Sequence, residues 1–319
     1  MNQLKASFEQ FLTENEYRLE PKGLFEPINY ILGLRGKRFR PILLLAAYRA
    51  YQEDVSKAMP AAMAIEVFHN FTLLHDDIMD EAPLRRGAPT VHQKYDTNTA
   101  ILSGDAMMIS AYQWIGQYTS LPQFASILAT FSRTALDVCR GQQMDMDFEH
   151  SWDITVDDYL EMIRLKTAVL LGASLKIGAL IAGASAEDAD GLYDFGIAAG
   201  LAFQIQDDIL DSFGDMASVG KQVGGDIIHN KKTFLLVKTL TQVEHPKDLI
   251  DFMEQTTDAH KKVDYVKSQM IGSGALDAAD MLRDDYYEKS LNILDELNMA
   301  DNQKEFFSEL ALKMARRMF

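Results

Sequence analysis

Apolar residues recur every three or four positions along almost the whole chain, as at Ile28, Ile31 and Leu32 and again at Tyr159 and Met162. This spacing places them on one side of a helix, whereas the alternation typical of a half-buried strand is nearly absent. Breaks that contain glycine or proline divide the pattern into about ten or more segments. We therefore predict an all-α fold.

The helical pattern continues from end to end without a linker. Low-complexity tracts, Gly/Ser-rich stretches and long charge blocks are absent from the sequence, so we predict one domain over residues 1–319. The longest apolar stretch, residues 167–186, approaches the length of a membrane span but contains Lys176 and many Gly and Ala residues. We interpret it as a buried central helix and expect no stable membrane insertion.

Composition and net charge limit the kinds of partner that this chain is expected to bind. The 319 residues are 47% hydrophobic, which is enough to bury a sizeable core. The 31 Lys and Arg against 47 Asp and Glu give a net charge of −16, which disfavours nucleic acid and anionic membranes as partners. The single cysteine, Cys139, and a polar N-terminal stretch without an apolar signal core predict a cytoplasmic protein.

A short acidic pattern, DDxxD, occurs twice, at residues 76–80 and at residues 207–211. On a helix, positions i and i+4 share a face, so Asp76 lies above Asp80 and Asp207 above Asp211. Such like charges repel one another by a few tenths of a kcal/mol per pair. A bound cation would offset this repulsion.

The ligand type indicates which cation. Carboxylate oxygens without neighbouring Cys or His clusters favour magnesium, which binds through one or two carboxylates plus substrate phosphates. The alternative is a solvated acidic helix end. Each motif, however, directly follows an apolar helical run, which predicts two opposing helices that hold metal-bound diphosphate from two sides.

Two segments that adjoin the acidic motifs carry several basic residues. Residues 81–89 contain Arg85 and Arg86, and residues 212–232 contain Lys221, Lys231 and Lys232. They are candidate lids, although ordinary solvated connections have the same composition.

From about residue 36 to residue 233 the chain resembles the trans-prenyl diphosphate synthase (polyprenyl synthetase) family. The matching stretches are Gly36 to Pro41, Asp76 to Gly87, Gly141-Gln142, Lys166-Thr167, Gln204 to Asp211, Gly220-Lys221 and Lys231. The resemblance implies a helical isoprenoid synthase bundle with a central active-site cavity. It also implies a homodimer that condenses isopentenyl diphosphate with allylic diphosphates such as dimethylallyl, geranyl and farnesyl diphosphate.

The resemblance also implies roles for individual residues. Asp76, Asp80 and Asp207 would bind three Mg²⁺ ions, and Asp77, Asp208 and Asp211 would act behind them. The allylic diphosphate would be bound by Arg85, Lys166, Lys221 and Lys231, and the isopentenyl diphosphate by Gly36, Lys37, Arg40, His69 and Arg86. Thr167, Gln204 and the carbonyl of Lys166 would face the allylic cation. His69 has the weakest independent case, since a lone helical histidine is often a satisfied core or surface residue.

One departure follows the second motif. Where the family commonly has Gly-Lys-x-Thr, this chain has Asn230-Lys231-Lys232-Thr233. Because asparagine tolerates positive φ, we expect the turn to survive, and the register favours Lys231 over Lys232 as the phosphate ligand.

Product length is predicted from the residues before the first motif. Phe71 and, one turn deeper, Phe68 lie upstream of Asp76, and one helical turn of about 5.4 Å is comparable to a five-carbon unit. An aromatic residue here resembles short-chain synthases and points to a C15 or C20 product. The alternative is that both rings only pack in the core.

Two other functions fit parts of the sequence. A class I terpene cyclase would share the fold and the first DDxxD but would lack the second one and the basic pair Lys37 and Arg40. A non-catalytic subunit of a heteromeric synthase would be expected to have lost acids from one motif, and this chain keeps all six.

Overall fold

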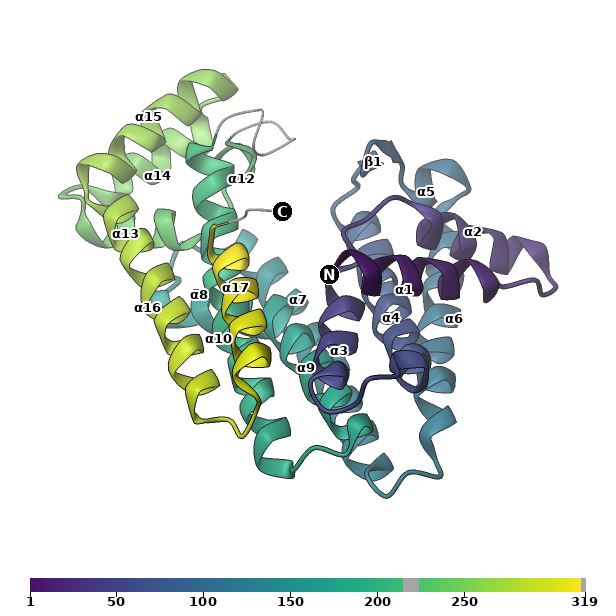
Figure 1. Ribbon diagram of the computed structural model, residues 1–319. Coiled ribbons are helices and arrows are strands. Elements are labelled where there is room, and N and C mark those ends of the chain that lie inside the picture. The colour runs from purple at the N-terminus through teal and green to yellow at the C-terminus, as the bar shows by residue number, and fades with distance from the viewer. Residues whose placement is uncertain (215–223, 317–319) are drawn as a thin grey trace. The chain divides into compact units, whose positions relative to one another are not determined.

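The computed structural model describes residues 1–214 and 224–316, and most of them lie in helices (Figure 1). The prediction of an all-α fold is confirmed. Strands β1 (Leu84–Arg85) and β2 (Ala88–Pro89) form one short antiparallel hairpin, in which Leu84 pairs with Pro89 and Arg85 with Ala88.

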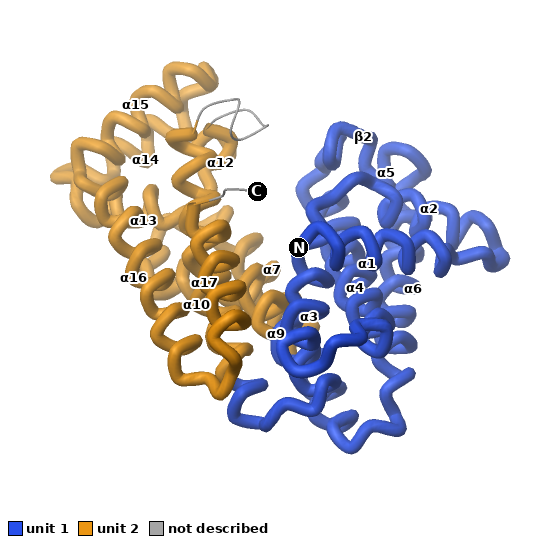
Figure 2. Tube along the Cα trace, in the orientation of Figure 1, with its two compact units in different colours: residues 1–131, 173–190 blue, residues 132–172, 191–319 orange. Residues whose placement is uncertain are grey.

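The chain forms two compact units (Figure 2). Unit 1 consists of residues 1–131 and 173–190, and unit 2 consists of residues 132–172 and 191–319. That the whole chain acts as one domain stays a prediction.

Helix α4 is the central helix of unit 1. It packs along α6 and α3, and its side chains are buried on every face from Ala61 to Phe68, as expected for a helix that is apolar all round. The elements that lie wholly in unit 1 are α1 (Asn2–Glu14), α2 (Lys22–Gly33), α3 (Phe39–Arg49), η1 (Val55–Ala58), α4 (Met59–Met79), α5 (Val91–Lys94), α6 (Thr97–Ile115) and η2 (Gly116–Tyr118).

Unit 2 has its own core, in which Tyr159, Ile205, Phe234 and Leu235 are buried together. Its helices are α8 (Val156–Ile163), the π-helical turn η3 (Arg164–Ala168), α12 (Gly225–Ile228), α13 (Phe234–Gln242), α14 (Pro246–Gln255), α15 (Ala259–Gly272), α16 (Ala275–Glu296) and α17 (Asp301–Arg316). Helices α7 (Phe124–Glu149), α9 (Val169–Ala182) and α10 (Ala186–Phe213) contribute to both units.

One helical stretch, Val156–Ala182, is long and apolar enough to cross a membrane by length and composition alone. However, 78% of its most apolar window is buried inside the protein, as expected for a core helix. This burial favours our interpretation of the stretch as a central helix.

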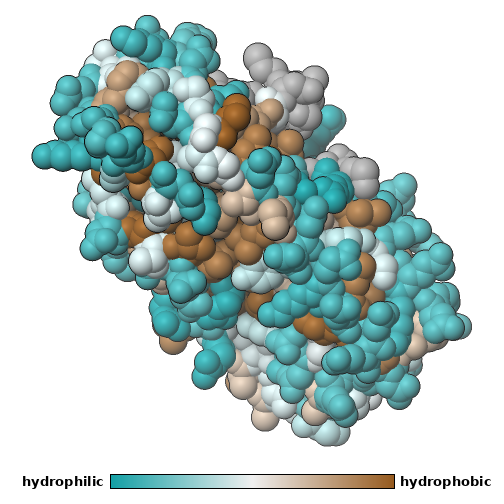
Figure 3. Space-filling model, turned by 90° about the vertical axis from the view of Figure 1, so that its left-hand side faces the viewer, coloured by the Kyte–Doolittle hydropathy of each residue, from teal (hydrophilic) through white to brown (hydrophobic). Residues whose placement is uncertain are grey.

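Hydrophobic groups on the surface form separate patches. On the face drawn in Figure 3, several brown patches are divided by hydrophilic surface. Among the described residues, the exposed large apolar side chains include Ile101, Leu102 and Ile109 of α6.

Candidate active site

The first DDxxD motif forms the last turn of α4. The amide of Asp80 donates to the carbonyl of Asp76 over 2.9 Å, and Asp80 is the residue at which the helix ends. Asp76 is partly buried, whereas Asp80 is exposed. At the end of this buried helix, Asp80 is thus exposed, while Asp76, one turn earlier, is 20% exposed and has one buried carboxylate oxygen.

Asp77 points inward and binds the hairpin instead. Its side chain is 2% exposed, and the Nε of Arg85 donates to its Oδ2 over 2.7 Å. Burial raises the pKa of Asp77, while the neighbouring Arg85 opposes this rise. The Nη2 of Arg85 also lies 3.8 Å from Asp76 Oδ2, so Arg85 attaches the β1–β2 hairpin to the motif.

His75, the residue before the motif, is held against α6. A Cβ added to Gly104 would lie 2.2 Å from His75 Nε2, and this nitrogen lies 3.1 Å from the carbonyl oxygen of Ile101. A side chain at Gly104 would displace the imidazole from this position. The last turn of α4 is therefore fixed on one side by α6 and on the other by Arg85.

Several of the predicted isopentenyl-site residues lie together in unit 1. Arg40 Nη1 donates to His69 Nε2 over 3.1 Å, and the guanidinium of Arg86 packs against Gly36, where a Cβ would lie 2.9 Å from Nη1. Lys37 is exposed on the loop that precedes α3. We call Gly36, Lys37, Arg40, His69 and Arg86 the basic cradle.

The electrostatics of the cradle favour a neutral histidine. Burial lowers the pKa of His69 well below its usual value, and Arg40 and Arg86 lower it further. Burial also lowers the pKa of Arg40, to about 10, and a guanidinium with that pKa remains charged at neutral pH. His69 therefore accepts the hydrogen bond from the Arg40 guanidinium and positions it without adding a positive charge to the cradle.

The second motif belongs to a hydrogen-bonded chain in unit 2. Thr167 Oγ1 donates to Gln204 Oε1 over 3.1 Å, and Gln204 Nε2 donates to Asp208 Oδ1 over 3.0 Å. The hydroxyl of Tyr159 donates to Asp208 Oδ2 over 2.6 Å. Burial and then the nearby charge of Asp226 raise the pKa of Asp208, while these hydrogen bonds lower it.

A pocket of about 150 Å³ opens beside this chain. It is lined by Asp145, Tyr159, Met162, Ile163, Lys166, Thr167, Gln204, Asp208, Asp226, Lys231, Lys232 and Thr233. Five of these residues were predicted from the sequence: Lys166, Thr167, Gln204, Asp208 and Lys231. The tertiary structure of unit 2 therefore brings together cations, amide and hydroxyl groups, and acids from distant parts of the chain.

A π-helical turn, η3, places Lys166 and Thr167 in this pocket. Such turns interrupt the regular i to i+4 ladder and are frequent at functional sites. The turn lies against α7, where a Cβ at Gly141 would be only 2.3 Å from the backbone nitrogen of Lys166.

Two acids of the pocket were missed by the sequence analysis. Lys166 Nζ donates to Asp145 Oδ2 over 2.5 Å, and Asp226 is one of the charges that raise the pKa of Asp208. Asp145 lies one helical turn after Gly141, so the register of α7 could have identified it. Asp226 follows the glycine pair at 224–225, a weaker signal.

Other predicted residues have different surroundings. Asp211 Oδ1 accepts a hydrogen bond from the amide of Asp226 over 2.9 Å, which attaches the end of α10 to the start of α12. Asp207 is partly exposed on α10. Lys221 lies outside the described residues.

The turn at Asn230 exists as predicted, with φ of +55°. Beyond it, Lys232 is buried, its Nζ donates to the carbonyl of Glu149 over 3.2 Å and lies 4.1 Å from the centroid of the Trp152 ring. These contacts give Lys232 a structural role and favour Lys231 as the phosphate ligand.

Phe68 and Phe71 belong to an aromatic cluster of unit 1. Their ring centroids are 5.6 Å apart, Phe68 lies 5.5 Å from Phe131, and Phe71 lies 4.9 Å from the His75 ring. Phe71 therefore stands between the deeper ring and the residue that precedes the first motif. Both the packing role and the chain-length role fit this position.

Within the parts of the chain that the structure describes, no three His, Cys, Asp or Glu side chains form a preassembled metal site. Asp76 and Asp80 nevertheless offer hard oxygen ligands on one helix face. Such a donor set fits a hard divalent cation that takes its remaining ligands from water and substrate phosphates.

Known proteins resemble this chain over most of its length. A geranylgeranyl diphosphate synthase from Sulfolobus acidocaldarius is 40% identical over 286 residues, which cover 88% of this chain and 86% of the relative. A geranylfarnesyl diphosphate synthase from Natronomonas pharaonis is 40% identical over 241 residues, or 70% of each chain. A crystal structure of a geranylgeranyl pyrophosphate synthase matches with a TM-score of 0.94 and 44% identity, covering 98% of both chains.

The family profile agrees with these relatives. The profile described as polyprenyl synthetase matches residues 21–270, which include both DDxxD motifs, the basic cradle and the pocket of unit 2. The predicted family and its isoprenoid synthase fold are confirmed: this chain belongs to the polyprenyl synthetase family.

Proposed function

We propose that this protein is a trans-prenyltransferase that condenses isopentenyl diphosphate with an allylic diphosphate to give a linear, all-trans, short-chain (C15–C20) prenyl diphosphate. Dimethylallyl, geranyl and farnesyl diphosphate are the candidate allylic substrates. One observation carries most of this proposal. Unit 1 contains accessible paired carboxylates, suited to a metal-bound diphosphate, together with a separate basic cradle, suited to a metal-free one.

This combination argues against the alternatives. A terpene cyclase needs only one diphosphate site and has no use for the cradle around Arg40 and His69. A non-catalytic subunit would have no reason to keep the bonded chain from Thr167 through Gln204 to Asp208. Two anion sites of different chemistry fit a reaction between two diphosphates.

The proposed cofactor is Mg²⁺, as three ions, with Asp76, Asp80 and Asp207 as protein ligands. When bound, these ions withdraw charge from the allylic diphosphate so that its C–O bond can break. Asp77, Asp208 and Asp211 act behind the ligands: Asp77 orients Arg85, and Asp211 holds the start of α12. Such supporting contacts orient ligands and tune their charge.

Side chains and a backbone carbonyl of the protein bind the allylic diphosphate and stabilise the charges that form when its C–O bond breaks. Lys166, Arg85, Lys221 and Lys231 bind the allylic diphosphate, and their charges stabilise the departing pyrophosphate. Thr167 Oγ1, Gln204 Oε1 and the carbonyl of Lys166 offer partial negative charge to the allylic cation without attacking it. The apolar helices around the site exclude water.

Condensation and elimination complete the reaction. The double bond of isopentenyl diphosphate, held by the basic cradle, attacks the allylic cation and forms the new C–C bond. This leaves the positive charge on the tertiary carbon of the isopentenyl unit. The released pyrophosphate then takes a proton from the neighbouring carbon, and the electrons of that C–H bond form the new double bond. No protein nucleophile is needed.

We further propose a cytoplasmic homodimer. The exposed apolar side chains of Ile101, Leu102 and Ile109 on α6 offer a surface that a second copy would cover. Neither nucleic acid nor a membrane is expected as a partner of a chain with a net charge of −16.

Incorporation of labelled isopentenyl diphosphate tests the proposed function. With Mg²⁺ and geranyl diphosphate, wild-type protein should form linear prenyl diphosphates, whereas a cyclase would form cyclic hydrocarbons and a non-catalytic subunit nothing. Asp76→Ala and Asp207→Ala should each lose at least about a hundredfold in turnover while remaining folded. Asp264→Ala, which removes an exposed acid of α15, should keep wild-type turnover. Near wild-type turnover in either motif variant would refute the assignment.

A further inference from the structure

A buried ion pair lies directly behind the basic cradle. Arg38 Nη1 donates to Glu66 Oε1 over 2.6 Å, and the two side chains are only 5% and 2% exposed. Asn70 Nδ2 donates to the same Glu66 oxygen over 2.9 Å. Arg38, Glu66 and Asn70 are not among the residues assigned to substrate above.

Arg38 joins the end of α2 to α4. Its Nη2 donates to the carbonyl of Leu32 over 2.5 Å and to that of Leu34 over 3.1 Å. These are carbonyls at the end of α2, which an isolated helix would leave to water. The guanidinium thus anchors both sides of the short loop that carries Gly36 and Lys37.

The same loop is also attached to the cradle. Arg86 Nη1 lies 3.4 Å from the Leu34 carbonyl, so Arg38 and Arg86 share one backbone oxygen. Arg38 itself has a left-handed backbone, with φ of +53°, directly before α3 begins at Phe39. A left-handed non-glycine residue is costly and persists where its surroundings hold it.

Glu66 is the acid that faces this group of cations. Its charge raises the pKa values of Arg40 and Arg86, in each case opposing the lowering caused by burial. Glu66 lies on α4, one turn before His69, which accepts the hydrogen bond from Arg40. Glu66 therefore pairs directly with Arg38, and its charge also acts on Arg40 and Arg86 before any diphosphate arrives.

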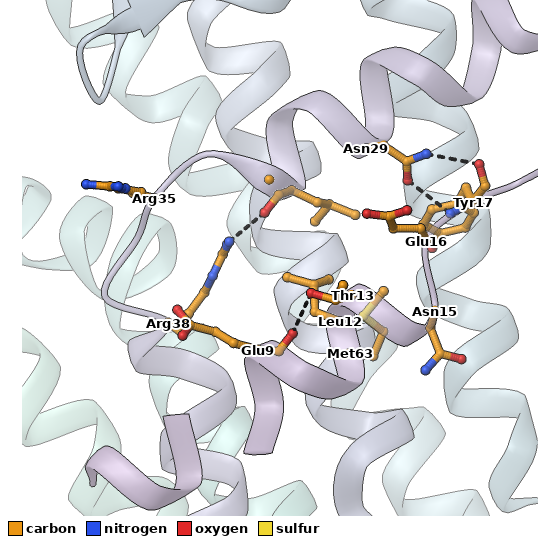
Figure 4. Close-up of a pocket in the computed structure, with 12 residues that line it drawn as sticks. Glu9, Leu12, Thr13, Asn15, Glu16, Tyr17, Asn29, Arg35, Arg38 and Met63 are labelled. Carbon is orange, nitrogen blue, oxygen red and sulfur yellow. Dashed lines mark hydrogen bonds between the residues drawn. The ribbon is translucent and has the colours of Figure 1, made fainter. Parts of the chain in front are cut away.

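Packing alone does not fix Arg38. Its side chain lines a pocket of about 230 Å³, whose walls include Glu9, Leu12, Tyr17 and Met63 (Figure 4). Arg35, from the loop before α3, also lines this pocket. Because one side of Arg38 faces this pocket, its hydrogen bonds to Glu66 and to the end of α2 determine where it lies.

We propose that Arg38 and Glu66 are positioning residues that hold the cradle in its diphosphate-binding arrangement before isopentenyl diphosphate binds. This inference rests on the proposed function. Stability alone does not explain the pair, because replacing a buried ion pair by apolar residues of similar volume is often neutral or stabilising. Preorganisation explains the Arg38–Glu66 pair, because a loop that is already fixed before isopentenyl diphosphate binds loses less entropy on binding.

Glu66→Gln is the first test, because it keeps an acceptor for Arg38 and removes the charge. We expect the KM for isopentenyl diphosphate to rise about tenfold, the size expected when a supporting contact is lost. The KM for geranyl diphosphate should stay within about twofold of wild type. Asp188→Asn, which removes another buried acid of unit 1, should change neither value.

Three results with Glu66→Gln would overturn the proposal. An unchanged KM for isopentenyl diphosphate would show that the pair has no positioning role. A lower KM would mean that Glu66 acts only by weakening the positive field. A parallel rise in both KM values would indicate a general structural role.

The double variant Arg38→Met with Glu66→Leu separates positioning from stability. We expect a melting temperature at or near that of wild type, together with a KM for isopentenyl diphosphate raised at least tenfold. A stable double variant with the wild-type KM would also refute the proposal. Failure of the proposed function is distinguishable, because wild-type protein would then incorporate no isopentenyl diphosphate at all.

Discussion

The backbone of Gly141 on α7 lies directly against the backbone of Lys166 in the π-helical turn, where a Cβ would come within 2.3 Å of the Lys166 nitrogen. A methyl group cannot fit at this distance unless one of the two backbones moves. Lys166 and Thr167 line the pocket of unit 2 from this turn. Their placement therefore requires that residue 141 has no side chain.

Gly141→Ala should therefore impair catalysis. We expect kcat to fall at least about tenfold, because small displacements of positioned groups are costly. The measurement is steady-state turnover of geranyl and isopentenyl diphosphate, with circular dichroism to verify folding. Gly272→Ala, at a helical glycine of unit 2 with no atom within 4 Å of the added Cβ, should behave as wild type. Equal turnover of Gly141→Ala and wild type would contradict the role assigned to this contact.

Substitution of Lys231 should weaken substrate binding, whereas substitution of Lys232 should lower the stability of the fold. Lys232→Met loses the hydrogen bond to the Glu149 carbonyl and the contact with Trp152, which should cost about 1–2 kcal/mol in the free energy of unfolding. Lys231→Met should instead raise the KM for geranyl diphosphate about tenfold or more, as expected when a charged hydrogen bond to phosphate is lost.

Thermal melts and KM values of both variants measure this difference. If Lys232→Met raised the KM and Lys231→Met did not, the register assignment would be reversed.

Phe71→Ala should lengthen the product. Removing the ring opens space between Phe68 and His75, so growth can continue by one or more five-carbon units. Chromatography of dephosphorylated products would measure the shift, and adding Phe68→Ala should extend it. Phe8→Ala, which removes a fully buried ring from α1, controls for destabilisation alone. If Phe71→Ala made the wild-type product, Phe71 would no longer be the chain-length residue.

His69 should make the protein sensitive to acid. Its pKa is well below the usual histidine value in the folded state, because of burial and the neighbouring arginines. In the unfolded chain His69 is protonated near pH 6.5, whereas in the folded chain it stays neutral at that pH. The free energy of unfolding therefore falls as the pH drops below about 6.5.

His69→Gln removes this titration and keeps a neutral acceptor for Arg40. We expect the loss of melting temperature between pH 7 and pH 5 to be smaller in His69→Gln than in wild type. His260→Gln, on α15 of unit 2, should leave the pH dependence unchanged. Identical pH profiles of His69→Gln and wild type would show that His69 is not the responsible group.

Local patterns in the sequence were sufficient to predict the fold class and the two acidic motifs, whereas the roles of the basic residues were implied by the family resemblance. The apolar spacing predicted helices, and helical periodicity placed Asp76 with Asp80 on α4. The turn at Asn230 was predicted from the tolerance of asparagine for positive φ, which the structure has. These features depend on residues within a few positions of one another.

Contacts between distant segments could not be predicted in this way. The pairing of Arg38 with Glu66, of Lys166 with Asp145 and of Tyr159 with Asp208 joins residues 21 to 49 positions apart. The register of α7 places Asp145 one turn after Gly141, but it does not show which residue Asp145 meets. Only the fold brings it next to Lys166.

The sequence by itself determined that this is a helical member of the polyprenyl synthetase family with two acidic motifs and a set of basic residues. The tertiary structure decided which of those residues meet. It buried Asp77 and Asp208, left Asp76 and Asp80 accessible, and placed Arg38 and Glu66 behind the cradle. The physical reason is that helix periodicity is a local property, whereas burial and charge pairing depend on which helices pack together.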